Sequence, residues 1–180
     1  MATHSYLDEV WLVVSPHNPL KDIKKLMPDA HRLQMARLAI RENENLQICD
    51  VEFGLPKPSF TVNTMRHLKA LYPDVEFSII MGEDNLVSLN KWRDYEELLA
   101  NYKILVYPRI STSEGMRDLK QELPEEFKDA QITICDAPLL EISSTFIRES
   151  IRDKKDVRYL LPEAVINYIS NNFLYEKESL

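Results

Sequence analysis

The sequence predicts an α/β protein with a doubly wound, mostly parallel sheet and helices on both faces. Short apolar runs of strand length alternate along the chain with segments whose apolar residues recur at helical spacing. The first of these strand-like runs ends in a continuous apolar stretch, which is typical of a strand buried in a parallel sheet. Polar clusters follow the strands or open the helices, so they can share one crevice at the carboxyl edge of such a sheet.

The bulk composition fits one domain over residues 1–180 and argues against several classes of protein. The net charge of −7 argues against a general affinity for nucleic acid, and it is compatible with a local basic pocket for a small anion. No apolar run approaches the roughly 20 residues that span a bilayer, and no signal peptide is visible. Cys49 and Cys135 lie in strand-like runs without metal-ligand spacing, so we expect buried thiols of a cytoplasmic protein.

The first strand is predicted at residues 7–14, which end in a continuous apolar run. A loop with two prolines, residues 15–21, follows it at the edge where open α/β sheets bind ligands. His17 and Lys21 could meet an anion there, or they could be incidental charges of a solvated loop.

The next segment, residues 29–43, is predicted to form a helix with Asp29 as its N-cap. Arg32 lies in the first turn of this helix, where a basic residue opposes the helix dipole. An anionic group nearby, either a ligand or a carboxylate, would explain its position. A second strand is predicted at residues 46–53.

A second helix is predicted over residues 59–71, with Ser59 or Thr61 as its N-cap. Threonine is a poor choice for a helix interior, but its hydroxyl is useful at a helix start. Thr61 is therefore either a plain capping residue or a hydroxyl donor for a ligand. A third strand is predicted at residues 75–81.

Three residues after the third strand are candidates for a binding site. Gly82 permits close approach of backbone or ligand at the carboxyl end of this strand. Asp84 can cap the following helix, or it can accept a hydrogen bond from a ribose hydroxyl. Trp92 lies further along that helical region, where a tryptophan is more often a core residue than a stacking platform.

The rest of the chain completes the alternation. A fourth strand is predicted at residues 103–107, and Arg109 just beyond it points toward the same crevice. Residues 110–129 are polar and show no clear apolar face, so we expect a surface excursion. A fifth strand is predicted at residues 131–135, and a final pair of helices at residues 156–161 and 162–171.

The segment Ile142-Ser143-Ser144-Thr145-Phe146-Ile147-Arg148 is predicted to open a short amphipathic helix. Ser144 is the expected N-cap, Thr145 the first helical residue, and Arg148 lies one turn further on the same face. Hydroxyls, unpaired backbone N–H groups and a guanidinium then converge at the positive end of a helix, as a phosphate requires. An ordinary capped helix with a surface arginine explains these residues equally well. With only three glycines, the chain can form neither a P-loop nor a G-x-G-x-x-G fingerprint.

Several motifs occur together along the chain: Ser15-Pro16-His17-Asn18-Pro19-Leu20-Lys21, His31-Arg32-Leu33-x-Met35, Pro58-Ser59-Phe60-Thr61-x-x-Thr64-Met65, Met81-Gly82-x-Asp84-x-Leu86-x-x-Leu89-x-x-Trp92, Tyr107-Pro108-Arg109 and Ile142-Ser143-Ser144-Thr145-x-Ile147-Arg148. With them the chain resembles the bacterial nicotinate-nucleotide adenylyltransferases of the Rossmann-like nucleotidyltransferase superfamily, over residues 7–175. The last motif is specific to the superfamily, and the segments ending at Met65 and Trp92 point to this member of it.

The resemblance implies a Rossmann-like fold and a defined reaction. The family joins the adenylyl group of ATP to the 5′-phosphate of nicotinate mononucleotide, releasing pyrophosphate and forming the dinucleotide precursor of NAD. One phosphate attacks another in line, so the protein must position both and neutralise charge, with Mg²⁺ bound through the ATP phosphates. No covalent intermediate is implied, which fits a site of hydroxyls, helix N-termini and basic side chains.

The resemblance also assigns residues to the two substrates. The residues expected to bind ATP are Gly82, Asp84, Ser143, Ser144, Thr145 and Arg148. The residues expected to bind the mononucleotide and its phosphate are Lys21, Thr61, Trp92 and Arg109.

The chain departs from the family at its start. The family begins with a central strand and a loop of the form Gly-x-Phe-x-Pro-x-His-x-Gly-His, which this sequence lacks. No residue is therefore assigned a catalytic role, and the first strand of the sheet is expected to be missing. A late start codon or truncation, a degenerate homologue, or a strand supplied by another segment or chain would each explain this, and we favour the first.

Two alternatives to the adenylyltransferase remain open from the sequence. One is a nucleotide-binding homologue without turnover, because the histidine loop is absent. The other is an adenylyltransferase that acts on a different phosphate acceptor, for example phosphopantetheine. The Thr61 and Trp92 segments speak against the latter, because they match a site for a flat carboxylated ring. Nicotinamide in place of nicotinate and a homo-oligomeric state also stay open.

Overall fold

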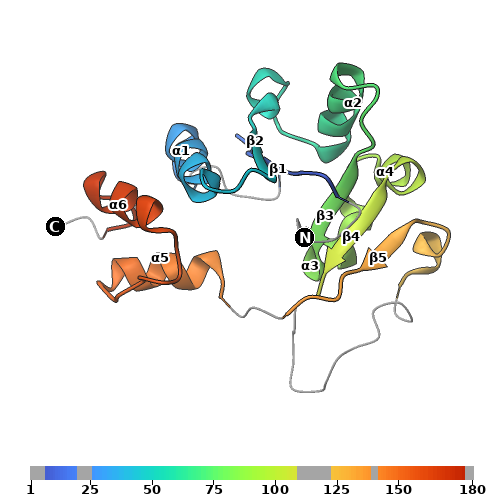
Figure 1. Ribbon diagram of the computed structural model, residues 1–180. Coiled ribbons are helices and arrows are strands. Elements are labelled where there is room, and N and C mark those ends of the chain that lie inside the picture. The colour runs from blue at the N-terminus through green and yellow to red at the C-terminus, as the bar shows by residue number, and fades with distance from the viewer. Residues whose placement is uncertain (1–6, 20–25, 109–122, 139–141, 177–180) are drawn as a thin grey trace, which may run out of the picture. The chain divides into compact units, whose positions relative to one another are not determined.

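Figure 1 shows a computed structural model of the chain, which describes residues 7–19, 26–108, 123–138 and 142–176. The chain divides into two compact units, a terminal unit (Met1–Pro56 with Ile142–Leu180) and a central unit (Lys57–Glu141). Each unit contains a parallel sheet, of two strands in the terminal unit and three in the central unit. Parallel strands that alternate with helices confirm the predicted α/β class, whereas the single domain over the whole chain stays a prediction.

The sheet of the terminal unit consists of β1 (Val10–Val13) and β2 (Leu46–Cys49), paired with Val10 opposite Leu46. Helix α1 (Asp29–Ile40) lies between them in the sequence, since two parallel strands need a crossover connection. The loop after β1 therefore lies at the carboxyl edge of this sheet, as predicted.

Two expectations for this sheet are wrong. The second strand ends at Cys49 instead of residue 53, because Val51–Gly54 turns into the 3-10 helix η2. The first strand was expected to be buried, but Leu12 and Val13 are 39% and 36% exposed. A two-stranded sheet offers few neighbouring side chains to cover its faces, and among the described residues β1 pairs with β2 alone.

The helices of the terminal unit share one apolar cluster. Helices α5 (Ser144–Arg152) and α6 (Glu163–Asn171) follow one another near the end of the chain. Val165, Ile169 and Leu174 are buried, and they pack against side chains of α1 and α5, namely Met35, Leu38 and Ile151. This cluster ties the last helices to α1, although more than 100 residues separate them in the sequence.

The helix predicted at residues 156–161 is wrong. These residues form turns and one isolated bridge between Arg158 and Leu161. The Asp156 carboxylate accepts hydrogen bonds from the backbone N–H and the guanidinium of Arg158, at 2.9 Å for the N–H. Such a local side-chain bond stabilises a turn in competition with a helix. Pro162 precedes α6 as its N-cap instead of being its first residue.

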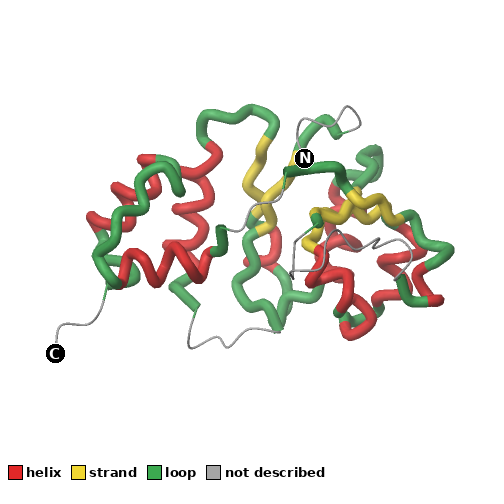
Figure 2. Tube along the Cα trace, turned by 90° about the horizontal axis from the view of Figure 1, so that it is seen from below, coloured by secondary structure: helices red, strands yellow, loops and turns green. Residues whose placement is uncertain are grey.

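The central unit contains the larger sheet, with strands in the order β3-β4-β5, all parallel. Its strands are β3 (Ser78–Gly82), β4 (Lys103–Tyr107) and β5 (Ile132–Ile134). Its helices are α2 (Thr61–Leu71), α3 (Glu83–Val87) and α4 (Tyr95–Asn101), with 3-10 turns η3 (Leu89–Lys91) and η4 (Glu125–Phe127). Figure 2 shows these strands as one group with the helices of the unit around them.

The core of this unit is formed by side chains from the sheet and the helices together. The fully buried ones are Val62, Leu89, Leu98, Ile104, Val106 and Phe127. Phe127 lies in the segment that we expected to be a surface excursion, so that expectation is wrong for its end. Cys49 in the terminal unit and Cys135 in this one are both buried and unbonded, as predicted.

The predicted N-caps at Asp29, Thr61 and Asp84 are wrong, because each of these residues already lies inside its helix. Ser59 is not a cap either. The Asp29 carboxylate instead accepts a hydrogen bond from Arg32. The observed N-caps are Pro28, Phe60 and Gly82, and none makes a side-chain cap bond.

We expect Lys154→Gly to stabilise the protein by about 0.5–1 kcal/mol, because lysine pays a steric cost there that glycine avoids. Helix α5 ends in a Schellman motif, with N–H bonds from Lys154 to Ile151 (2.9 Å) and from Lys155 to Ser150 (2.8 Å). Lys154 has a φ of 56°, in the left-handed region. Urea unfolding would measure the gain. The next residue, Lys155, has no positive φ, so we expect Lys155→Gly to destabilise the protein. Equal effects of the two substitutions on the free energy of unfolding would contradict this explanation.

Candidate functional site

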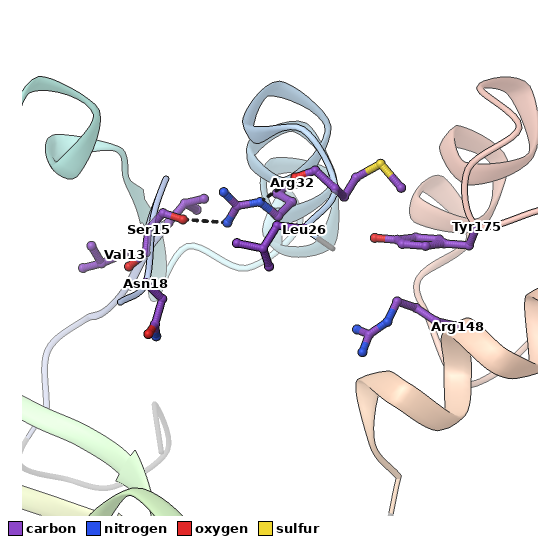
Figure 3. Close-up of a pocket in the computed structure, with 9 residues that line it drawn as sticks. Val13, Ser15, Asn18, Leu26, Arg32, Arg148 and Tyr175 are labelled. Atoms are coloured by element: carbon purple, nitrogen blue, oxygen red, sulfur yellow. Dashed lines mark hydrogen bonds between the residues drawn. The ribbon is translucent and has the colours of Figure 1, made fainter. Parts of the chain in front are cut away.

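The terminal unit contains a pocket of about 430 Å³ beside the carboxyl end of β1. This volume is in the range of small-molecule sites. Figure 3 shows side chains from β1, its loop, α1, α5 and the segment after α6 around it. The described lining residues include two arginines and no carboxylate: Val13, Val14, Ser15, Asn18, Leu26, Met27, Arg32, Arg148 and Tyr175. The pocket therefore suits an anionic ligand.

Arg32 builds one wall of this pocket. Its side chain is 21% exposed, and its guanidinium donates to the backbone carbonyls of Met27 (3.0 Å), Ser15 (2.6 Å) and Pro16 (3.2 Å). It also pairs with the Asp29 carboxylate at 2.5 Å. Of the two expected explanations for an arginine in this first turn, the carboxylate is confirmed. Arg32 thus ties the loop after β1 to the start of α1, and most of its donors are used within the protein.

The start of α5 forms another part of the site. The helix begins at Ser144, and its N-cap is Ser143, whose hydroxyl oxygen accepts a hydrogen bond from the Phe146 N–H at 3.1 Å. The predicted cap at Ser144 is wrong by one residue, because Ser143 has the extended backbone of a cap and Ser144 is already helical. The N–H groups of the first helical residues precede the first intrahelical bond and face outward from the positive helix end.

Arg148 joins this helix start to the pocket. One Nη atom donates to the Thr145 hydroxyl at 3.1 Å, so a hydroxyl and a guanidinium converge one turn apart, as predicted. Among the described residues Arg148 makes only this hydrogen bond, which leaves most of its five N–H donors available. Unlike Arg32, Arg148 can therefore bind a ligand phosphate through several charge-assisted hydrogen bonds.

Tyr175 lies close to Arg148 at the pocket, as Figure 3 shows. Burial raises the pKa of the Tyr175 phenol, while the positive charges of Arg148 and Arg32 act in the opposite direction. The phenol is therefore protonated at neutral pH and can donate a hydrogen bond. Tyr175 is a site residue that was not expected, because its position near the end of the chain gives no signal in the sequence. In contrast, the basic residue Arg32 in the first turn of α1 did indicate an anionic group nearby, which is the Asp29 carboxylate.

In the central unit, two candidate segments are brought together. Thr61 is the first residue of α2, and Trp92 follows η3. The guanidinium of Arg93 lies 4.9 Å from the ring centre of Phe60, which links the neighbours of these two residues. Trp92 is half-buried against the core, and its indole Nε1 is buried without a hydrogen-bond partner among the described residues.

The other candidates of the central unit lie at the carboxyl end of β3. Gly82 is the last residue of β3 and lies opposite Tyr107 of β4. Asp84 is exposed in the first turn of α3. Lys21 and Arg109 lie outside the described residues. One crevice shared by the candidates of both units stays a prediction.

Two features are absent from the described part of the chain. No three His, Cys, Asp or Glu side chains there come together in a group that could hold a metal ion. No helix in those same ranges is long and apolar enough to cross a membrane.

Comparison with known proteins shows the family of this chain. The model of the cytidylyltransferase-like family matches residues 2–150, so the chain belongs to this class of protein. A relative from Flavobacterium johnsoniae, named "Probable nicotinate-nucleotide adenylyltransferase", is 49% identical over 98% of this chain and 88% of its own length. A Bacteroides fragilis protein of the same name is 44% identical over 91% of this chain and 77% of its own length. The chain belongs to the nicotinate-nucleotide adenylyltransferase family.

A solved structure supports the fold independently. The Plasmodium falciparum nicotinic acid mononucleotide adenylyltransferase complexed with NaAD matches with a TM-score of 0.74, over 97% of this chain and 85% of its own. Its sequence is only 19% identical, so this likeness concerns the fold alone. The predicted Rossmann-like fold is confirmed.

Proposed function

We propose that this chain transfers the adenylyl group of ATP to nicotinate mononucleotide, giving nicotinate adenine dinucleotide and pyrophosphate on the way to NAD. The observation that carries the proposal is the pocket lined by Arg148, whose guanidinium is hydrogen-bonded to Thr145 at the start of α5, in a member of this family. Because Arg32 is paired with Asp29, the guanidinium of Arg148, which makes one hydrogen bond among the described residues, is the group of this pocket that favours a phosphate ligand.

In this proposal the protein positions the two reacting phosphates and neutralises their charge. The phosphate of the mononucleotide attacks the α-phosphate of ATP, and pyrophosphate leaves on the opposite side. The start of α5 and Arg148 would hold the triphosphate: the helix N–H groups and the hydroxyls of Ser143, Ser144 and Thr145 donate to its oxygens, and Arg148 neutralises charge that develops on the leaving group.

The remaining candidates are assigned to the nucleosides and the second phosphate. We propose that Gly82 and Asp84 meet the ribose of ATP, and that Thr61 and Trp92 hold and stack the nicotinate ring. Lys21 and Arg109 would face phosphate groups. The proximity of the Thr61 and Trp92 segments through Arg93 and Phe60 supports a shared ring site.

We propose that Mg²⁺ arrives bound to the phosphates of ATP. The donors at the start of α5 are hydroxyl, amide and guanidinium groups, which bind phosphate oxygens, whereas Mg²⁺ prefers carboxylates, waters and phosphates as ligands. The ion would therefore be held mainly by the nucleotide, and it supplies further neutralisation of the triphosphate charge.

The test is pyrophosphate release from ATP with nicotinate mononucleotide and Mg²⁺, and nicotinamide mononucleotide serves as the matched acceptor. The 180-residue chain is assayed beside a form that carries a Gly-x-Phe-x-Pro-x-His-x-Gly-His segment ahead of residue 1. We expect at least one of the two forms to release pyrophosphate. This release should depend on nicotinate mononucleotide and should be weaker with nicotinamide mononucleotide. If ATP binds both forms and neither releases pyrophosphate, the chain is a nucleotide-binding homologue without turnover.

Trp92→Ala is expected to weaken binding of nicotinate mononucleotide about 10-fold and to leave ATP binding unchanged, since stacking of one ring is worth about 1–3 kcal/mol. Titration calorimetry with each ligand measures both affinities. Trp92→Phe keeps an aromatic face and should retain most of the affinity, which separates stacking from a loss of core packing. An unchanged affinity for the mononucleotide in Trp92→Ala would remove Trp92 from the ring site.

A further inference from the structure

The segment after α6 is held in place by backbone hydrogen bonds and by one buried side chain. Helix α6 ends in a Schellman motif, with N–H bonds from Phe173 to Ser170 (3.2 Å) and from Leu174 to Ile169 (3.0 Å). Phe173 has the left-handed φ of 52° that this motif requires. Leu174 is 7% exposed and packs in the same cluster as Ile169. These contacts therefore hold in place the backbone that leads to Tyr175.

Tyr175 has a second left-handed backbone, with a φ of 64°. The Schellman motif accounts for Phe173 but not for Tyr175, and bulky residues rarely adopt this conformation without a reason. The result of this turn is that the tyrosine ring lies at the pocket, whereas the Phe173 side chain is 74% exposed. Strained residues of this kind gather where a structure positions a functional group.

The surroundings of the Tyr175 hydroxyl suit an anion. The ring contacts the apolar cluster of α6, while Figure 3 shows the oxygen end of the side chain extending over the pocket, above the guanidinium of Arg148. Among the described residues this hydroxyl makes no hydrogen bond, so its donor is available. A neutral phenol also adds no negative charge beside a bound phosphate, which a carboxylate in its place would do.

We propose that the Tyr175 hydroxyl donates a hydrogen bond to the phosphate chain of the nucleotide, beside Arg148. The inference rests on the proposed function for the identity of this ligand. The position of the hydroxyl in an anion-binding pocket is supported by the pocket itself, the turn after α6 and the two arginines. Tyr175 is then a substrate-binding residue near the end of the given sequence, and the Schellman motif of α6 together with the left-handed backbone of Tyr175 positions it.

The test measures binding of inorganic triphosphate and of ATP to the wild-type chain and to Tyr175→Phe. The phenylalanine keeps the ring and its packing, so only the hydroxyl is lost. We expect both ligands to bind about 10-fold more weakly, because a hydrogen bond to a charged group is lost. The melting temperature and the affinity for nicotinate mononucleotide should not change. Tyr159→Phe is the matched control, because Tyr159 is 99% exposed and lies outside the pocket.

Each other outcome has a distinct meaning. Wild-type affinity for triphosphate in Tyr175→Phe would overturn the proposal, and so would a lower melting temperature with equal losses for all ligands, which indicates a structural role. A wild-type chain that does not bind triphosphate would overturn the proposal too. The proposed function is judged separately by pyrophosphate release, so it can stand when the role of Tyr175 fails.

Discussion

Replacing Arg148 with alanine is expected to weaken ATP binding about 100-fold, the largest effect on binding that the site predicts. Arg148 lines the pocket and makes one hydrogen bond to the described residues, to Thr145, so its remaining donors are available for the triphosphate. Loss of several charge-assisted hydrogen bonds costs about 2–3 kcal/mol, which corresponds to this factor. Titration calorimetry with ATP at low salt measures it.

Two further variants make this experiment specific. Arg148→Lys keeps the charge but loses the planar fork, so we expect an intermediate loss of about 10-fold. Arg152→Ala removes the same side chain from the exposed last turn of α5 and should change ATP affinity by less than about 2-fold. Equal losses in Arg148→Ala and Arg152→Ala would mean that general charge, and not a phosphate contact, determines binding.

The largest expected effect on stability is that of Phe127→Ala, which should lower the free energy of unfolding by about 3–5 kcal/mol. Phe127 is 1% exposed in the core of the central unit, and its ring contacts Tyr95 edge-on at 6.3 Å between ring centres. Truncation removes buried apolar area and leaves a cavity, since the strands and helices around it can move inward only in part. Urea unfolding measures the loss.

The matched control is Phe146→Ala, because Phe146 is 53% exposed on α5. Its replacement should change the free energy of unfolding by less than about 1 kcal/mol. Phe127→Leu, which keeps most of the volume, should cost less than Phe127→Ala. If Phe127→Ala destabilised no more than Phe146→Ala, the ring would not be part of the core.

Phe127 illustrates what pattern reasoning missed. The segment around it is polar and irregular, so it shows neither the period of a helix nor that of a strand. Its burial comes from η4, a single turn that places one aromatic ring against Tyr95. A single long-range contact leaves no periodic signal in the local sequence, so it could not be predicted.

The helix ends show the same difference between features set by local sequence and features set by long-range contacts. The spacing from Thr145 to Arg148 is a local property of a helix, and the structure confirms that the two side chains meet. The cap at Asp29 was wrong, because its carboxylate pairs with Arg32, whose other bonds reach the loop after β1. Residue type alone does not tell which of two hydrogen-bond partners a carboxylate takes.

The sequence by itself determined the alternation of parallel strands and helices, the strand at Lys103–Tyr107, and the hydroxyl and guanidinium groups that meet at the start of α5. These depend on short-range periodicity and on side chains within one turn of each other. Only the tertiary structure decided that Arg32 is used within the protein, that Arg148 remains available, and that Tyr175 reaches the pocket. Those outcomes depend on which distant segments meet: the loop after β1 takes up the donors of Arg32, and the packing of α6 against α1 brings the segment of Tyr175 to the pocket.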